Sequence, residues 1–220
     1  MPRTVLSNRV CVFAGPSLPV GDRVAAPGIH YAPPAARGDV ARAADDYDAL
    51  LLVDGVFHQD LAVTPHETLA ACRRVPFYGA ASMGALRAVE CRPYGAIPLG
   101  VIARWYGSGT IDGDDEVAVS MHPQTHAALS VPAVNVRYVA WLAKRRGILD
   151  EAAARAWVHI ARTTIYYAER SWPAAVACAP PGARSALLDI ARREGDLKGM
   201  DARFALRRVL RLRASRHAVA

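Results

Sequence analysis

One pattern recurs three times in the first half of the chain: a short apolar run, a turn of small or polar residues, and later a helix-forming run. The apolar runs span residues 10–14, 49–53 and 75–78. The middle run is apolar throughout, which is typical of a strand that is buried on both faces. Repeated strand–turn–helix units predict a mostly parallel sheet with right-handed crossovers. The three turns, near Ser17, Asp54 and Ser82, would then open on the same edge of that sheet.

From residue 134 onward the pattern becomes helical. We expect helices over residues 134–146, 151–170, 189–194 and 200–213, with Gly147 ending the first and Asp150 capping the second. A chain of 220 residues is long enough for one sizeable core and a small helical appendage. The predicted fold class is therefore α/β. A mostly parallel sheet lies in residues 1–125, and a helical subdomain in residues 126–220 packs across the sheet edge within one integrated domain.

Composition excludes several classes of protein. With 52% hydrophobic and 21% charged residues, the chain is expected to be globular rather than disordered. It has no apolar run long enough to span a membrane, and its N-terminus lacks the pattern of a secretory signal, so we expect a cytoplasmic protein. Its four cysteines are widely scattered and are predicted to be buried thiols, neither a disulfide framework nor a zinc site.

The net charge of +7 is carried almost entirely by arginine, because Lys144 and Lys198 are the only lysines. Lysine can lose its proton when it is desolvated, whereas arginine cannot, so a lysine in such a background is a candidate base. Lys144 is predicted to lie at an exposed helix C-terminus. The arginine-rich helix that ends the chain is expected to dock on the core with a solvated basic face. An acidic protein partner is the next alternative, and nucleic acid is disfavoured because no aromatic stacking platform accompanies the charge.

Ser82 follows a predicted strand, lies in a cluster of small residues and precedes a helix-forming run at Met83. Small neighbours let backbone N–H groups approach a bound atom closely, and a helix N-terminus adds unpaired donors and a positive dipole end. A serine in this position is either a helix N-cap or a nucleophile. Because the chain lacks the G-x-S-x-G spacing of a nucleophile elbow, an ordinary serine hydrolase is the weaker alternative.

Other polar residues near the predicted strand ends also have two interpretations. Ser17 is either a turn residue or part of the site, and Asp54 is either turn chemistry or a functional acid. Arg37 is either a solvated loop residue or an anion contact beside Asp39, which is expected to cap the next helix. Thr64, Pro65 and Glu67 fit a capping box, whereas His66 could belong to the cap or to the site.

Asp114, Asp115 and Glu116 form an acidic segment that is expected to lead into a strand over residues 117–119. Such a segment suits a metal site, a basic partner or a solvated turn. His122 and His126 follow at a spacing of four residues, but the intervening proline weakens the helical geometry that a metal-binding pair needs. We therefore expect no metal.

Five segments together identify a resemblance. They are FAGPSLP (13–19), PPAARGD (33–39), DGVF (54–57), GAASMGALRAVE (79–90) and DDEVA (114–118). In this order and spacing they resemble the TfuA-like family, with the firmest match at residues 82–90. The helical half resembles the family more loosely, through VNVR (134–137), YAERSW (167–172) and LKGMDA (197–202). The last of these departs from a Gln-Lys-Arg-x-Asp-Ala-like family motif at residues 197, 199 and 200.

The resemblance implies a partner of a YcaO enzyme, which uses ATP to activate a peptide backbone amide so that sulfur replaces its oxygen. The TfuA-like protein would need no cofactor of its own. It would release sulfide from a thiocarboxylated, ThiS-like sulfur-carrier protein through a serine–lysine pair and help YcaO to bind its ribosomal peptide. The serine is Ser82 and the lysine matches Lys198. The implied substrate and oxyanion contacts are Gly15, Ser17, Arg37, Asp54, Gly55, Met83, Gly84 and Arg87, and further motif positions are His66, Glu67, Glu90, Asp114, Asp115, Glu116 and Asp201.

Three hypotheses therefore remain open from the sequence. In the first, the protein is a hydrolase that releases sulfide from the carrier, with the Ser82 hydroxyl attacking the thiocarboxylate and Lys198 taking its proton. In the second, it is a non-catalytic activator that holds YcaO and peptide together. In the third, it is an unrelated serine hydrolase. The first requires the fold to bring Lys198 to Ser82, since the two are far apart in the sequence.

Overall fold

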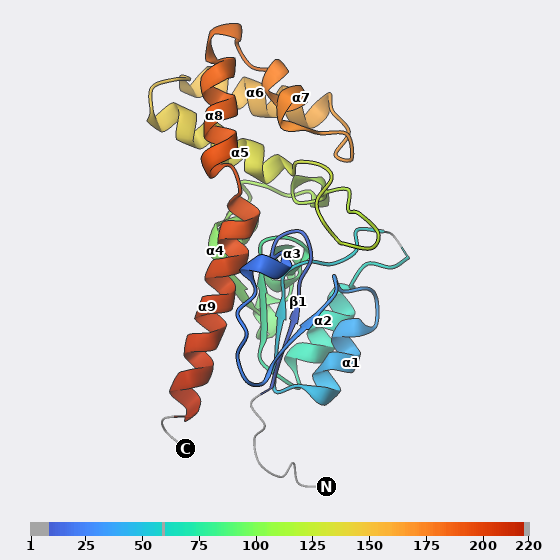
Figure 1. The fold of residues 1–220 in the computed structure, drawn as a ribbon. Coiled ribbons are helices and arrows are strands. Elements are labelled where there is room, and N and C mark those ends of the chain that lie inside the picture. Colours follow the sequence, from blue (N-terminus) through green and yellow to red (C-terminus); the bar gives the residue numbers. More distant parts are fainter. Residues whose placement is uncertain (1–8, 59, 218–220) are drawn as a thin grey trace, which may run out of the picture. The chain divides into compact units, whose positions relative to one another are not determined.

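The computed structural model describes residues 9–58 and 60–217 (Figure 1). The chain divides into two units. One consists of Met1–Ile111 with Gly199–Ala220 and is called the α/β unit below; the other is Asp112–Lys198 and is called the helical unit. A parallel sheet lies in the first and helices fill the second, which confirms the predicted fold class. Every helix within the described residues is too short or too polar to cross a membrane.

The α/β unit is built on a five-stranded, all-parallel sheet in the order β2-β1-β3-β4-β5. The strands are β1 (Val10–Phe13), β2 (Ile29–Ala32), β3 (Ala49–Leu52), β4 (Phe77–Ala80) and β5 (Ile97–Leu99). The three predicted strands are β1, β3 and β4, and they occupy the centre. The edge strands β2 and β5 were not predicted, because each is half-exposed and lacks a continuous apolar run.

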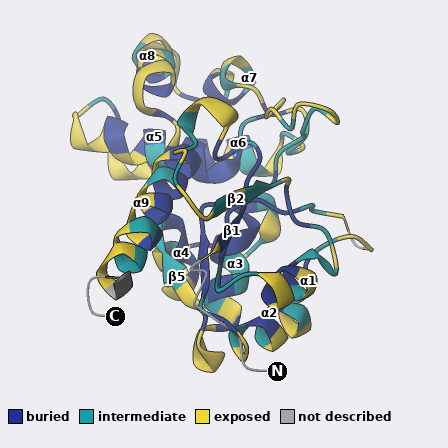
Figure 2. Ribbon diagram, turned by 60° about the horizontal axis from the view of Figure 1, so that its bottom comes forward, coloured by how far each residue is buried: buried dark blue, intermediate teal, exposed yellow. Residues whose placement is uncertain are grey.

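Helices cover both faces of this sheet, and the alternation of side chains along the strands separates the two layers (Figure 1). Cys11 and Phe13 of β1 face a core shared with α1 (Asp39–Asp46), α2 (Pro65–Cys72) and α3 (Met83–Glu90). Val10 and Val12 face the opposite core, to which α9 (Leu197–His217) contributes alanines and leucines. Figure 2 shows α9 buried along one side and exposed along the other. The helix α4 (Gly100–Gly107) follows β5.

The helix starts in the α/β unit correct two predictions and confirm one. Asp39 is the first residue of α1 and not its cap; Gly38 holds the N-cap with φ 90°, and the Asp39 carboxylate accepts from the Ala36 amide instead. Thr64 caps α2 as predicted, because its hydroxyl oxygen accepts from the Glu67 amide at 3.1 Å. The Glu67 carboxylate does not complete a capping box, since it accepts from the first amides of α1.

The helical unit contains α5 (Ala133–Arg145), α6 (Glu151–Thr163), α7 (Trp172–Ala177) and α8 (Arg184–Glu194), packed around a core that includes Val139, Trp157 and Leu187. Asp150 caps α6 as predicted, and Gly147 follows α5 in the left-handed conformation, with φ 70°. The short helix α7 was not predicted. The structure starts α8 and α9 earlier than expected, and α9 continues to His217.

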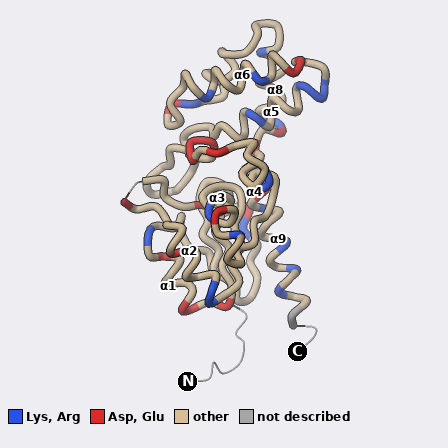
Figure 3. The backbone as a smooth tube through the Cα atoms, turned by 180° about the vertical axis from the view of Figure 1, so that it is seen from behind, with Lys and Arg blue, Asp and Glu red and all other residues tan. Residues whose placement is uncertain are grey.

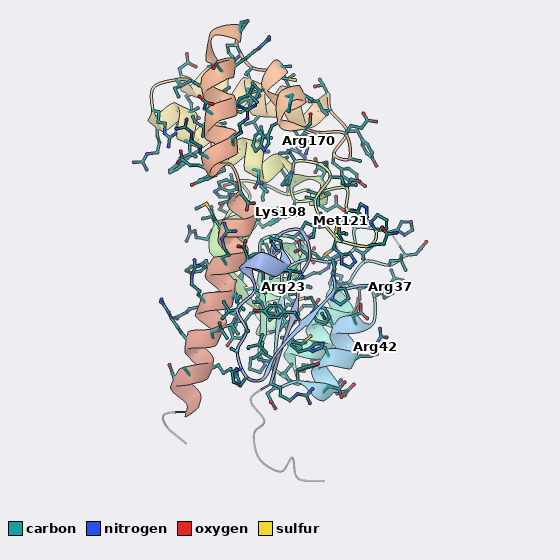
Figure 4. All side chains as sticks on the ribbon, in the orientation of Figure 1. Arg23, Arg37, Arg42, Met121, Arg170 and Lys198 are labelled. Carbon is teal, nitrogen blue, oxygen red and sulfur yellow. The ribbon has the colours of Figure 1, made fainter. Side chains whose placement is uncertain are left out.

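Two predictions in this unit are wrong. Helix α6 ends at Thr163, not at Arg170, because the buried Arg170 guanidinium takes the Ala161, Ile165 and Val131 carbonyls as acceptors and holds the following segment in a turn (Figure 4). The expected strand over residues 117–119 is absent from this described segment. Val117 instead closes the 3-10 turn Asp114–Glu116, and its carbonyl accepts a side-chain hydrogen bond.

Candidate active site

Ser82 lies between the end of β4 and the start of α3, in a strained turn. Ala81 has φ 63°, which is rare for a residue other than glycine, and the Ser82 amide donates to the Ala80 carbonyl two residues back at 2.7 Å. Such a conformation costs on the order of 1–3 kcal/mol and persists only where the surrounding structure holds it. Strained positions of this kind concentrate at functional sites.

The Ser82 side chain does not act as a helix cap. Ser82 holds the N-cap position of α3, yet its hydroxyl makes no capping hydrogen bond; its carbonyl oxygen accepts from the Ala85 amide at 3.0 Å. The residue is only 2% exposed. The sequence left two roles open for Ser82, a helix cap and a nucleophile. Its side chain does not serve as the cap.

Two glycines allow α3 to approach the sheet closely enough to place Ser82 at its edge. A Cβ on Gly84 would lie 1.8 Å from the Leu52 carbonyl oxygen, and a Cβ on Gly79 would lie 2.1 Å from the Gly84 carbonyl oxygen. The Gly84 amide donates to the Val53 carbonyl at 3.2 Å. The first turn of α3 thus rests directly on the ends of β3 and β4.

Asp54 joins the turns after β1 and β3 through three hydrogen bonds. Its Oδ2 accepts from the Gly15 and Ser17 amides, both at 2.9 Å, and its Oδ1 accepts from the Ser17 hydroxyl at 2.7 Å. Asp54 and Ser17 are each 2% exposed. This arrangement confirms that the predicted turns open on one edge of the sheet, and it gives Asp54 a structural role in holding the β1 turn.

Six of the predicted substrate and oxyanion contacts gather at this edge. Gly55 packs against Met83, since an added Cβ at residue 55 would lie 2.9 Å from the Met83 Cγ. The amides of Ser17 and Gly84 already donate to protein acceptors. The Met83 amide occupies the N1 position of α3, where a helix provides no acceptor, so it is the best placed donor for an oxyanion beside Ser82.

The two predicted arginine contacts lie outside this group. Arg87 donates from Nε to the Val63 carbonyl and from a terminal nitrogen to Glu90, each at 2.6 Å, so it ties α3 to the segment before α2. Arg37 lies on an exposed loop (Figure 4), where its amide donates to the Leu61 carbonyl at 2.7 Å. His66 is exposed in the first turn of α2.

Asp201 connects two helices of the α/β unit. Its carboxylate accepts from the Val101 amide at 2.9 Å and from the Ile102 amide at 2.7 Å, which caps the N-terminus of α4 from α9. Gly100 has φ 96°, and a Cβ there would lie 2.4 Å from this carboxyl group. Burial raises the pKa of Asp201, while the two amide hydrogen bonds and Arg104 act in the opposite direction.

The acidic segment is neutralised by arginines in the helical unit. Glu116 has a fully buried side chain, which accepts from Arg137 Nε at 2.8 Å and lies 3.3 Å from Arg162. Arg162 also pairs with Asp115 at 2.8 Å. Among the described residues, no group of three or more histidine, cysteine or acidic side chains is arranged to hold a metal ion. Asp114 is exposed in the same turn.

Lys198 is the last residue of the helical unit and is 3% exposed (Figure 4). Its Nζ donates to the Val117 carbonyl at 2.8 Å, and its amide donates to Asn135 Oδ1 at 3.2 Å. Buried lysines are rare, and this one has a fixed side chain. Ser82 belongs to the α/β unit, so the pairing of Ser82 with Lys198 stays a prediction.

Asn135 and Arg170 are two buried polar residues that have no predicted role, yet they fix the helical unit around Lys198 and α6. A polar residue between the valines at 134 and 136 was the available signal for Asn135. The four cysteines are free thiols, as predicted, but only Cys11 and Cys91 are buried; Cys72 and Cys178 are half-buried. Burial raises the pKa of Cys11 to about 12 and that of Cys72 to about 11, so neither is a reactive thiolate at neutral pH.

A family model described as TfuA-like protein matches residues 54–171, which is more than half of the 220-residue chain. The matched range contains Ser82 and the acidic segment, and it ends before Lys198. No curated protein matches the chain.

Proposed function

The chain belongs to the TfuA-like family, and we propose that it is the sulfide-releasing partner of a YcaO enzyme. TfuA-like proteins are associated with YcaO-dependent thioamidation. In this proposal the protein hydrolyses the C-terminal thiocarboxylate of a ThiS-like sulfur-carrier protein. Ser82 is the nucleophile and Lys198 is the base, and YcaO uses the sulfide on the peptide that it has activated with ATP.

The observation that carries this proposal is the setting of the Ser82 hydroxyl. It is buried, it makes no capping hydrogen bond, and it follows a residue with positive φ at the mouth of a parallel sheet. A merely structural serine at this position would cap α3, which stabilises a protein by about 1 kcal/mol. A nucleophile needs an oxygen that the helix amides do not occupy.

The proposed reaction has two steps. In the first, the Ser82 Oγ attacks the thiocarboxylate carbonyl carbon while the neutral Lys198 amine takes the hydroxyl proton. The tetrahedral intermediate then breaks its C–S bond, and the sulfur leaves as hydrosulfide with the proton that Lys198 returns. In the second, a water molecule gives one proton to Lys198 and attacks the Ser82 ester. The ester bond then breaks, Lys198 returns the proton to the Ser82 oxygen, and the carboxylic acid left on the carrier releases its proton to solvent.

Two features of the chain support the individual steps. The amine must be neutral to accept a proton, and desolvation disfavours the charged form of a lysine, which suits a residue that is 3% exposed. The Met83 amide is at the N1 position of α3, which has no acceptor within the helix, and it would stabilise the oxyanion, helped by the positive end of the helix dipole. Removing one such donor typically costs about 100-fold in rate.

The test is sulfide release from a thiocarboxylated carrier by variants of the two residues. Ser82→Ala and Lys198→Met are expected to lose release by about 100-fold or more, since each removes a group that reacts. Matched controls are available within the chain. Ser130→Ala changes another buried serine, one that is not among the predicted contacts, and Lys144→Met changes the other lysine, which is exposed and paired with Glu151.

The controls separate the hydrolase from the scaffold. If the Ser82→Ala and Lys198→Met proteins release sulfide at the normal rate, the hydrolase hypothesis is wrong. If thioamidation by added YcaO also persists with these variants but is lost without the protein, the protein acts as a non-catalytic activator. The unfolding temperature of each variant shows whether a loss of rate reflects a loss of fold.

A further inference from the structure

A groove of about 350 Å³ runs between α5 and α6, and every residue that lines it belongs to the helical unit. Its floor is apolar, made by Ala140 of α5 with Ala154 and Val158 of α6. These side chains are well buried although the groove is open above them. The groove is therefore wide enough for one apolar side chain of a partner, and its walls decide what else that partner must carry.

An aromatic and cationic wall rises on the α5 side. Trp141 is 41% exposed, its ring stacks on Tyr138 at 5.8 Å, and the Arg145 guanidinium lies 5.0 Å from its centroid. These two contacts hold the half-exposed indole in place. Tryptophan, tyrosine and arginine are the residues that most often dominate binding energy at protein interfaces.

Cations outnumber carboxylates where α5 ends and α6 begins. Lys144 and Arg155 share the carboxylate of Glu151, at 2.7 Å and 3.8 Å, and Arg145 adds a third positive charge beside Trp141. With Asp150, the N-cap of α6, these three cations face two carboxylates. The side chain of Arg155 is 74% exposed. Farther along the groove, Arg137 and Arg162 are balanced by the carboxylates of the acidic segment. The surplus positive charge therefore lies where Lys144, Arg145 and Arg155 border the groove; Figure 3 colours the lysines and arginines of α5 and α6 blue.

We propose that this groove is a docking site for an acidic peptide segment of a partner protein. An apolar side chain of the segment fills the floor between Ala140 and Val158, beside Trp141. Its glutamates or aspartates lie against Lys144, Arg145 and Arg155. The net charge of +7 adds a long-range attraction for such a partner. This inference goes beyond the proposed hydrolysis, because the groove shares no residue with Ser82 or Lys198.

Binding of short fluorescein-labelled peptides, followed by fluorescence anisotropy, tests the proposal on the full chain. The acidic probe is a run of glutamates around one leucine. A second probe carries serine in place of the leucine, and a third carries lysines in place of the glutamates. The acidic probe is expected to bind most tightly of the three. Its binding should weaken when serine replaces the leucine, and weaken further as salt screens the charges.

Variants show whether this binding occurs in the groove. Trp141→Ala and Arg155→Glu are each expected to weaken binding of the acidic probe about tenfold. The first removes the aromatic wall, and the second reverses an exposed charge. Arg192→Glu makes the same charge change on the exposed surface of α8 and should leave binding unaltered. Ser82→Ala should also leave it unaltered, which keeps this test independent of the proposed hydrolysis.

Several outcomes would overturn the proposal. One is equal binding of the acidic and lysine probes. Another is an equal effect of Arg155→Glu and Arg192→Glu. Tighter binding of a single-stranded oligonucleotide than of the acidic probe would favour a nucleic acid, and loss of a dimer in sedimentation on Trp141→Ala would make the groove a contact between copies of this chain.

Discussion

Asp54 offers a sharp test of the site, because its two substitutions with alanine and asparagine should behave differently. The carboxylate accepts from two buried amides through Oδ2 and from the Ser17 hydroxyl through Oδ1. An asparagine can place its carbonyl oxygen where Oδ2 accepts from the two amides. Its amide nitrogen can take the place of Oδ1 and donate to the Ser17 hydroxyl oxygen, since a hydroxyl also accepts. An alanine satisfies none of the three groups.

The expected magnitudes follow from these bonds. Asp54→Ala leaves the Gly15 and Ser17 amides and one hydroxyl without their acceptor, at about 1–3 kcal/mol for each buried group, or about 3 kcal/mol at the lower limit. For a chain of this size that corresponds to a fall in unfolding temperature of roughly 6–12 °C. Asp54→Asn keeps the geometry and loses only the charge-assisted part of the bonds, so its cost should stay near 1 kcal/mol.

Thermal unfolding by circular dichroism measures both variants, and sulfide release measures their activity. We expect Asp54→Asn to remain close to the parent protein in unfolding temperature and in the rate of sulfide release. We expect Asp54→Ala to have a lower unfolding temperature than either. Equal destabilisation by the two substitutions would refute the hydrogen-bond account. Loss of activity in a fully folded Asp54→Asn protein would show that the negative charge itself takes part in the chemistry.

Three further predictions concern other contacts. Gly84→Ala should lower the unfolding temperature by several degrees, because its Cβ would lie 1.8 Å from the Leu52 carbonyl, whereas Gly107→Ala has open space and should be neutral or stabilising. Glu116→Gln removes the buried charge from its two arginines and should cost about 3 kcal/mol in urea unfolding, where an unaltered midpoint would contradict the role given to that pair. Burial raises the pKa of the Cys11 thiol from 9.0 in the unfolded chain to about 12 in the folded protein. Between these pH values the unfolded state has lost the thiol proton and the folded state has kept it. The free energy of unfolding therefore falls as pH rises, by up to about 1.4 kcal/mol per pH unit. Cys11→Ala should flatten that alkaline slope, and equal slopes in the two proteins would contradict the assigned burial.

The centre of the sheet could be predicted from the sequence because its strands are short, continuous apolar runs. β1, β3 and β4 are buried on both faces, and the residues that follow them meet at one edge, as Asp54 and Ser17 demonstrate. The outer strands could not be found in this way. β2 carries the exposed His30 and β5 carries the half-exposed Pro98, so neither has the apolar pattern of a central strand.

Contacts between distant segments account for most of what the sequence left undetermined. Glu67 has the spacing of a capping box within α2, but its carboxylate caps α1 because the two helices pack side by side. Glu116 belongs to a segment that resembled a solvated turn or a metal site. It is buried because Arg137 and Arg162, which lie 21 and 46 residues farther along, supply its counter-charges. Local patterns give the type of such residues but not their partners.

The most direct test of the central claim is a search for a covalent intermediate on Ser82. The protein is mixed with thiocarboxylated carrier, quenched with acid and analysed by intact mass and by peptide mapping. The account predicts an adduct equal to the carrier joined to the protein with loss of hydrogen sulfide, located on Ser82 and absent from the Ser82→Ala protein. Undiminished sulfide release by Ser82→Ala, with no adduct on the parent protein during turnover, would contradict it.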